Sequence, residues 1–174
     1  MRAKDWKEIS VRDPLPLERA LGIVWCVQND TFRFRVEMKD VPLTRRGILS
    51  TICSIYDPLG FAAPVILRGK AILQELCRKG VEWDDPVPDE LRSRWILWRS
   101  SIKELESLEV TRCLKPRKEE KIKALELHYF SDASQTGYGV AVYLRVVYEN
   151  IAPHVTFVLG KARVTPLNRK ITIP

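Results

Sequence analysis

Apolar residues recur at helical spacing in the stretch "DELRSRWILWRSSIKELESL", and this feature constrains the fold more than any other. They step by 4, 3, 4 and 3 positions, as in a single stripe along one face of a helix. The stripe consists of Leu91, Trp95, Trp98, Ile102 and Leu105. Pro88 is tolerated at a helix start, and Asp89 and Glu90 complement the positive N-terminal end of the helix dipole. Such a helix is stable when its stripe is buried, so we expect a core built around Trp98.

Two more helices are expected upstream of this one. Thr44 is suited to capping the first, because a Thr side chain accepts hydrogen bonds from the free N–H groups of a helix start. The apolar positions of this helix are Ile48, Leu49, Ile52, Ile55 and Tyr56. Asp57-Pro58 ends it, since the residue before a proline avoids the α region. The second helix is predicted over 64–79, with Gly80 as its stop. Its core candidates are Leu67, Leu73, Leu76 and Cys77.

The remaining patterned segments have the alternation typical of β-strands. Near the N-terminus, apolar and charged residues alternate in "FRFRVE" behind a turn at Asn29-Asp30, which predicts a β-hairpin. Near the C-terminus, β-branched and aromatic residues predict three antiparallel strands at about 125–132, 138–148 and 154–163. The mixed-charge stretch between the helices and these strands has the composition of a linker. Helices in the middle and strands at both ends predict an α+β fold.

The overall composition is that of a folded, moderately basic protein. Of 174 residues, 45% are hydrophobic, which is ample for a core, and 29 Lys and Arg against 22 Asp and Glu give a net charge of +7. This charge suits a polyanionic partner, although solvated surface cations explain it equally well. Four scattered cysteines and two histidines disfavour a zinc site and indicate reduced, mostly buried thiols. The start of the chain has no apolar signal segment, so we expect a cytoplasmic or nuclear protein rather than a secreted one.

The stretch "HYFSDASQTGYGVAVYLR" places a carboxylate, Asp132, between a β-prone run and a hairpin turn. Two interpretations of Asp132 are open at this point. An Asp beside a turn commonly accepts hydrogen bonds from nearby backbone N–H groups, which is a structural role. An Asp at the end of a strand also suits the first carboxylate of a metal-dependent nuclease. Ser131 and Ser134 have the character of turn and hydrogen-bonding residues in either case.

Five blocks follow one another along the chain: "ALGIVWCVQNDTFRFRV", "LTRRGILSTICSIYDPLGFAAPVIL", "WDDPVPDELRSRW", "YFSDASQTGYGVAVYLR" and "HVTFVLGKARVTPLNRKITIP". Together they resemble a BEL/Pao-type LTR-retrotransposon polyprotein, in the region known as the Pao retrotransposon peptidase family. The resemblance implies four segments. They are the end of a reverse transcriptase palm with a primer-grip-like hairpin (1–42), a helical thumb and connection (43–112), a linker (113–124) and the start of a truncated RNase H-like domain (125–174).

The resemblance also implies a role for Asp132. An RNase H site uses several carboxylates to hold two divalent metal ions, Mg²⁺ or Mn²⁺, and the first carboxylate of the family falls on Asp132. The second is implied on a helix that follows "ITIP", beyond Pro174. We therefore expect this chain to bind no cofactor alone and to be inactive alone, because one carboxylate is too few for two metals. The parent polyprotein would perform RNA-directed DNA synthesis and RNase H cleavage of RNA–DNA hybrids.

A primer–template or an RNA–DNA hybrid is the implied partner, together with the remainder of the Pol polyprotein. Phosphate contacts require only suitably placed cations, so we expect weak binding that is independent of nucleotide sequence. The candidate contacts are Arg33, Arg35, Lys39, Arg45 and Arg46. For each of them, a solvated basic surface that binds nothing is the alternative.

Other catalytic sites find little support in the residues. The pair Asp84-Asp85 precedes a proline and a helix, so it suits a turn or a cap rather than a polymerase hairpin. The Asp-Thr-Gly or Asp-Ser-Gly triplet of an aspartic peptidase is absent, and His128 and His154 lie in predicted strands without a nucleophile motif. Two alternatives to the Pol fragment stay open. One is a non-enzymatic retroelement remnant that binds nucleic acid or a protein partner, and the other, with less support, is an aspartic peptidase.

Overall fold

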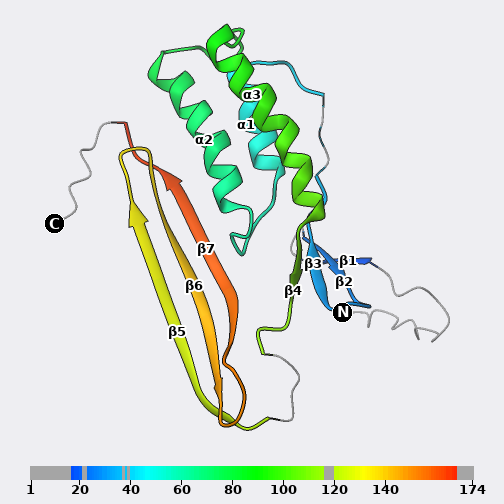
Figure 1. The fold of residues 1–174 in the computed structure, drawn as a ribbon. Helices are drawn as coiled ribbons and strands as arrows, with labels where there is room; N and C mark the ends of the chain where they lie inside the picture. The colour runs from blue at the N-terminus through cyan, green and yellow to red at the C-terminus, as the bar shows by residue number, and fades with distance from the viewer. Residues whose placement is uncertain (1–16, 21–22, 37, 39, 116–119, 168–174) are drawn as a thin grey trace, which may run out of the picture.

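A small sheet, three helices and a long three-stranded sheet follow one another in a computed structural model of the chain (Figure 1). The structure describes residues 17–20, 23–36, 38, 40–115 and 120–167. Its elements are β1 (Leu17–Ala20), β2 (Ile23–Cys26), β3 (Thr31–Arg33), α1 (Arg45–Ser54), α2 (Ala63–Arg78), α3 (Asp89–Ser101), the 3-10 helix η1 (Ile102–Ser107), β4 (Glu109–Thr111), β5 (Ile122–Ala133), β6 (Gly137–Tyr148) and β7 (His154–Val164). The predicted α+β class is confirmed.

The small sheet contains the predicted hairpin as β2 and β3, within the antiparallel order β1-β2-β3-β4. Asp30 in the connecting turn has a φ of 53°, a left-handed conformation that Asp tolerates better than most residues. The predicted strand was too long, because β3 ends at Arg33. Its partner β4 has only three residues, so the pairing stops there. Beyond β3, the N–H of Val36 donates to the Glu106 carboxylate at 3.0 Å rather than to a neighbouring strand. β4 itself follows η1 and was not predicted.

All three predicted helices are present, but α1 ends at Ser54, before the predicted stop at Asp57-Pro58, so Tyr56 lies outside the helix and is exposed. The hydroxyl of Thr44 accepts a hydrogen bond from the N–H of Gly47 at 3.2 Å, so Thr44 caps α1 as predicted. At the end of α2, Gly80 has a φ of 69°, and the N–H of Val81 donates to the carbonyl of Leu76 at 3.1 Å. This pattern is a Schellman-type termination, in which a left-handed glycine lets the chain leave the helix.

The predicted stripe on α3 and η1 is the centre of the helical core, because its five residues are all at most 7% exposed. Trp98 stacks on Trp95 with 4.8 Å between ring centroids, and its indole N–H donates to the carbonyl of Val65 on α2 at 2.8 Å. A side chain at Gly69 on α2 would overlap the Trp98 ring, so the glycine permits the close packing of α2 on α3.

The core face of α2 differs from the prediction. Leu76 is buried, but Leu67, Leu73 and Cys77 are half-buried, and Ile66 and Ile72 are the other buried side chains. The reason is that α2 packs on two sides, against α3 through Gly69 and against the long sheet. Leu67 lies on the sheet side, since a Cβ at Gly137 would stand 3.3 Å from its Cδ2.

The long sheet has the order β5-β6-β7, and its strands confirm the three predicted ones. β5 and β6 are paired along nearly their whole length, from Ile122 opposite Tyr148 to Ala133 opposite Tyr138. α2 lies beside β7 at the upper end of the sheet in Figure 1, and the lower part extends beyond the helices. The N–H of Gly160 on β7 donates to the carbonyl of Leu59 at 2.8 Å, which ties the loop before α2 to the sheet.

The four cysteines are free thiols, but the prediction that most of them are buried is wrong, because Cys53 is exposed and the other three are half-buried. Within the described part of the chain, none of the helices is both long enough and apolar enough to cross a membrane.

Candidate functional site

Asp132 lies near the end of β5, opposite Gly139 on β6, and it is exposed. Its Oδ1 accepts a hydrogen bond from the N–H of Ala133 at 2.8 Å, so the carboxylate supports the hairpin locally. The turn itself is held by Ser134, whose N–H donates to the carbonyl of Gly137 at 2.8 Å and whose hydroxyl accepts from the N–H of that residue at 3.2 Å. The turn role predicted for Ser134 is thus confirmed, and the Asp132 carboxylate retains free acceptor positions.

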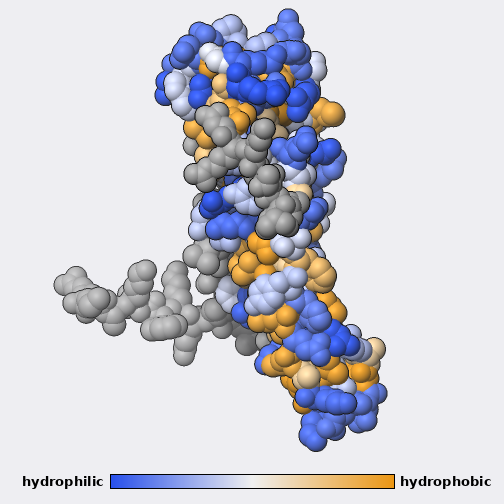
Figure 2. Space-filling view, turned by 90° about the vertical axis from the view of Figure 1, so that its left-hand side faces the viewer, coloured by the Kyte–Doolittle hydropathy of each residue, from blue (hydrophilic) through white to orange (hydrophobic). Residues whose placement is uncertain are grey.

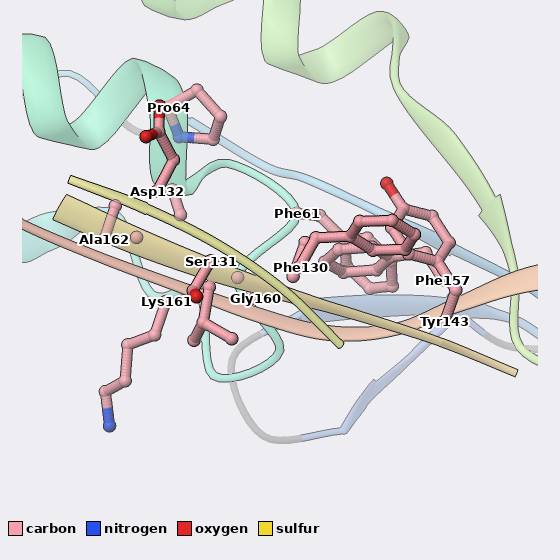
Figure 3. Close-up of a pocket in the computed structure, with 15 residues that line it drawn as sticks. Phe61, Pro64, Phe130, Ser131, Asp132, Tyr143, Phe157, Gly160, Lys161 and Ala162 are labelled. Atoms are coloured by element: carbon pink, nitrogen blue, oxygen red, sulfur yellow. The ribbon is translucent and has the colours of Figure 1, made fainter. Parts of the chain in front are cut away.

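A pocket of about 540 Å³ lies beside Asp132, between the sheet and the start of α2. Figure 3 shows the Asp132 carboxylate on the side of the sheet that faces Pro64, whereas Ser131 and Lys161 project from the opposite side. The rest of the pocket is largely apolar. Four aromatic rings form one cluster in it: Phe61, Phe130, Tyr143 and Phe157.

The aromatic cluster joins the sheet to the loop before α2. Phe61 lies 5.0 Å from Phe157 between ring centroids, and Tyr143 makes edge-to-face contacts with both Phe157 (5.5 Å) and Phe130 (5.8 Å). Such tilted and edge-to-face contacts are the favourable arrangements for aromatic pairs. Phe130 is still 59% exposed, so its ring offers a flat apolar surface next to the carboxylate of Asp132.

The loop at 57–62 forms the wall of the pocket, and a second carboxylate fixes its shape. Asp57 accepts hydrogen bonds from the N–H groups of Gly60 at 2.9 Å and Ala62 at 2.8 Å. Partial burial raises the pKa of the Asp57 carboxyl above its ordinary value, while the backbone donors oppose that rise. Asp57 therefore acts within the loop as a structural group. The predicted helix stop at Asp57 lies three residues beyond the end of α1 at Ser54, and the part of Asp57 in building the pocket was missed.

The described residues do not by themselves fit the two divalent metals of an RNase H site. They contain no group of three or more His, Cys, Asp or Glu side chains placed to hold a metal ion. Asp132 contributes one carboxylate at the pocket, whereas Mg²⁺ takes an octahedral shell of oxygen ligands and holds its waters where protein oxygens are few. Asp132 is therefore a single potential ligand.

The predicted phosphate-contacting arginines have protein partners in the structure. Arg33 forms an ion pair with Glu109 across β3 and β4 at 2.7 Å, and Arg46 forms a two-pronged pair with Asp84 at 2.8 and 3.0 Å. Both pairs are solvent-exposed. Arg35 is also exposed, and Lys39 lies outside the described residues.

Arg45 has contacts of a different kind, which indicate a structural role. One of its terminal N–H groups donates to the carbonyl of Val81 at 3.0 Å. Its guanidinium lies 4.1 Å from the ring centroid of Trp83, a distance typical of a cation–π contact. These contacts join the start of α1 to the segment between α2 and α3.

Two other predicted features are placed as expected. Asp84 and Asp85 lie in a bend before α3, where Asp84 pairs with Arg46.

His128 and His154 both lie in strands of the long sheet. The His128 ring nitrogen is 3.1 Å from the Glu126 carboxylate, and Arg145 pairs with the same carboxylate at 2.7 Å. The hydrogen bond from Arg145, helped by His128, lowers the pKa of Glu126.

An α+β chain with three antiparallel strands and an exposed aspartate on the first of them is compatible with an RNase H-like domain. Residues 44–174, three quarters of the chain, match the family described as Pao retrotransposon-like RNaseH-like domain. The chain belongs to this family, which makes it a Pao-type retrotransposon protein. No match was found among curated proteins.

Proposed function

We propose that the chain is a piece of a Pao-type Pol polyprotein whose parent performs RNA-directed DNA synthesis and cleaves the RNA strand of RNA–DNA hybrids. The position of Asp132 is the main support. It lies inside the family match, on the first strand of the long sheet, with an exposed carboxylate at the rim of a pocket. By the sequence resemblance, residues 1–42 correspond to the end of the polymerase palm and 43–112 to the thumb and connection.

Alone, the chain is proposed to be inactive as a nuclease. Asp132 would serve as one metal ligand in an intact enzyme that uses Mg²⁺ or Mn²⁺, and further carboxylates would have to come from residues other than those described. The matching family is described as RNaseH-like, which favours this proposal over an aspartic peptidase.

The proposed ligand of the chain is nucleic acid, bound weakly and without regard to sequence. The net charge of +7 supplies the attraction. The ion pairs of Arg33 and Arg46 do not prevent such binding, because a solvent-exposed ion pair contributes little to stability and a phosphate can replace the carboxylate. We place Arg33, Arg35, Lys39 and Arg46 at the phosphate backbone, with Arg45 holding the surface that carries Arg46. The cytoplasm or the nucleus is the proposed location.

A fluorescence anisotropy titration with a labelled RNA–DNA hybrid tests this proposal. At about 50 mM salt the chain should bind two hybrids of unrelated sequence with the same affinity, because phosphate contacts carry no sequence information. A single-stranded control and a DNA duplex show whether the hybrid is preferred. Absence of binding to all of these at low salt would leave the second candidate, a retroelement remnant that binds a protein partner.

A further inference from the structure

A second pocket, of about 800 Å³, lies between the small sheet and the start of β7. Three segments that are far apart in the sequence form its walls: the turn between β2 and β3, the strand β4 with the residues after it, and the first residues of β7. β7 begins at the lower end of the long sheet in Figure 1, whereas Asp132 lies near the end of β5, at the upper end. This pocket shares Phe157 with the pocket beside Asp132 and is otherwise lined by different residues.

The lining mixes aromatic, amide and charged side chains. Those used below are Trp25, Gln28, Asn29, Arg112 and Lys115. This mixture differs from the surface over the long sheet, where hydrophobic side chains gather in Figure 2, viewed from the β5 side. A purely apolar ligand would leave the polar groups without partners, so the pocket suits a ligand that combines a ring with polar and charged atoms. The volume is within the usual range of ligand pockets, about 300–1,000 Å³.

Trp25 and Arg112 form a stacked platform in this pocket. The guanidinium of Arg112 lies 5.0 Å from the ring centroid of Trp25. Asp30 holds both groups, because its carboxylate accepts hydrogen bonds from the Trp25 indole N–H at 3.2 Å and from Nε of Arg112 at 2.5 Å. The Arg112 side chain is still 43% exposed, so its plane is accessible to a ligand. The bases of nucleic acids stack on aromatic rings and on guanidinium planes.

Cations suited to a phosphate lie at the same pocket. Asp30 engages two N–H donors of Arg112, and a guanidinium has five, so donors remain for a ligand. Lys115 is exposed and forms no ion pair within the part of the chain that the structure describes. The two carboxylates in the lining are paired, Asp30 with Arg112 and Glu109 with Arg33. The Lys115 ammonium is therefore available to a phosphate.

We propose that this pocket binds one nucleotide, with its base on the platform of Trp25 and Arg112 and its phosphate at Lys115. The amide side chains of Gln28 and Asn29 supply donors and acceptors for the polar edge of the base. This proposal rests on the proposed binding of nucleic acid and names a place where one nucleotide is held. A free mononucleotide and a nucleotide within an unpaired strand have the same chemistry, so both serve as probes.

An NMR titration of the ¹⁵N-labelled full chain with adenosine 5′-monophosphate (AMP) tests the proposal. The indole N–H signal of Trp25, identified by its loss in Trp25→Phe, should shift, whereas the signal of Trp98, which is buried in the helical core, should not. Adenosine lacks the phosphate and inorganic phosphate lacks the base, so each should bind about tenfold more weakly than AMP.

A pair of lysine variants tests the position of the phosphate. Lys115→Ala should raise the Kd for AMP by about fivefold or more, because it removes a charge-assisted hydrogen bond. The matched control is Lys70→Ala on α2, which removes the same charge from another exposed position. The control should leave the Kd within about twofold, because salt screens a distant surface charge. Both lysines are exposed, so neither variant disturbs the core.

A short single-stranded oligoadenylate separates the two sources of the nucleotide. If it shifts the Trp25 signal at a lower concentration than AMP does, the ligand is a strand, and if AMP alone shifts the signal, the ligand is a free mononucleotide. Three results would each overturn the site: an unshifted Trp25 signal at about 10 mM AMP, a concentration that occupies even millimolar sites, an equal Kd for the two lysine variants, or an equal response to inorganic phosphate.

The anisotropy titration with the RNA–DNA hybrid reports separately on the proposed function. A chain that binds the hybrid but gives no Trp25 shift with AMP lacks this site and keeps the proposed function. A chain that binds AMP at Trp25 but does not bind the hybrid keeps the site and lacks the proposed function.

Discussion

Gly60 and Gly160 meet backbone to backbone, and their contact joins the helical part of the chain to the long sheet. A side chain at Gly60 would overlap the carbonyl oxygen of Gly160. Gly60 also has a φ of 84°, a conformation that other residues adopt only with strain. Asp57 holds the loop in this shape, and the adjacent carbonyl of Leu59 accepts the hydrogen bond from Gly160. The wall of the pocket beside Asp132 therefore depends on a glycine at position 60.

Substitution of Gly60 by alanine should destabilise the chain through both strain and overlap. Gly80→Ala is the matched control, because Gly80 also has a positive φ of 69° but no atom within 4 Å of an added Cβ. We expect Gly80→Ala to lower the free energy of unfolding by about 1–2 kcal/mol through backbone strain alone. Gly60→Ala should cost a further 1–3 kcal/mol or so from overlap with the sheet. Urea unfolding measures both, and equal costs would contradict the close contact.

The stripe on α3 predicts a large effect at Trp98. This residue is 5% exposed, stacks on Trp95 and donates to the carbonyl of Val65. Trp98→Ala should therefore lower the free energy of unfolding by about 3–5 kcal/mol. Leu97→Ala, one position away on the exposed face, should change it by less than about 0.5 kcal/mol. An unchanged melting temperature for Trp98→Ala would show that the helix packs through another face.

Acid should weaken the link between β3 and β4. Hydrogen bonds from Thr31 and then from Arg33 lower the pKa of Glu109. A carboxyl whose pKa is lower in the folded than in the unfolded chain adds stability above its unfolded value of about 4.3, and this contribution is lost as the pH falls through the folded value. NMR titration of Glu109 should give a midpoint below 4.3 or so, and Thr31→Val should raise it. In Glu109→Gln, the stability should fall less steeply below about pH 4 than in the wild-type chain.

Binding of an RNA–DNA hybrid should weaken steeply with salt if it rests on phosphate contacts. The slope of log K against log salt should change by roughly 0.9 for each phosphate contact removed. Replacing Arg33, Arg35 and Arg46 together by alanine should flatten the slope. The control variant replaces three other exposed cations and so removes the same charge: Arg68, Lys70 and Lys103. Its slope should stay steeper than that of the first variant. Equal slopes for the two triple variants would show that the three arginines are only a solvated surface.

The parts of the fold with regular local patterns could be predicted from the sequence. The stripe around Trp98 and the cap at Thr44 depend on neighbours in the chain, so their spacing carried the information. β4 could not be predicted in this way, because its three residues form a strand only through pairing with β3, 76 or more positions upstream. Likewise, the role of Asp57 depends on a loop whose shape is set by contact with Gly160.

The candidate site was predicted in part for the same reason. Asp132 stood out because a carboxylate follows a β-prone run, and that position is local. The aromatic cluster beside it combines Phe61 from the loop with Phe157 from β7. Because these residues are far apart in sequence, no local spacing pattern could predict their contact. The protein partners of Arg33 and Arg46 were missed because Glu109 and Asp84 lie at long sequence distances.

A cleavage assay on a labelled RNA–DNA hybrid tests most directly the claim that the chain is a nucleic-acid-binding part of an RNase H-like enzyme and is inactive alone. The purified chain is incubated with the hybrid at low salt and with Mg²⁺ or Mn²⁺, beside the Asp132→Asn variant. We predict a bound hybrid whose RNA strand stays intact in both samples. RNA cleavage by the wild-type chain that disappears in Asp132→Asn would contradict it.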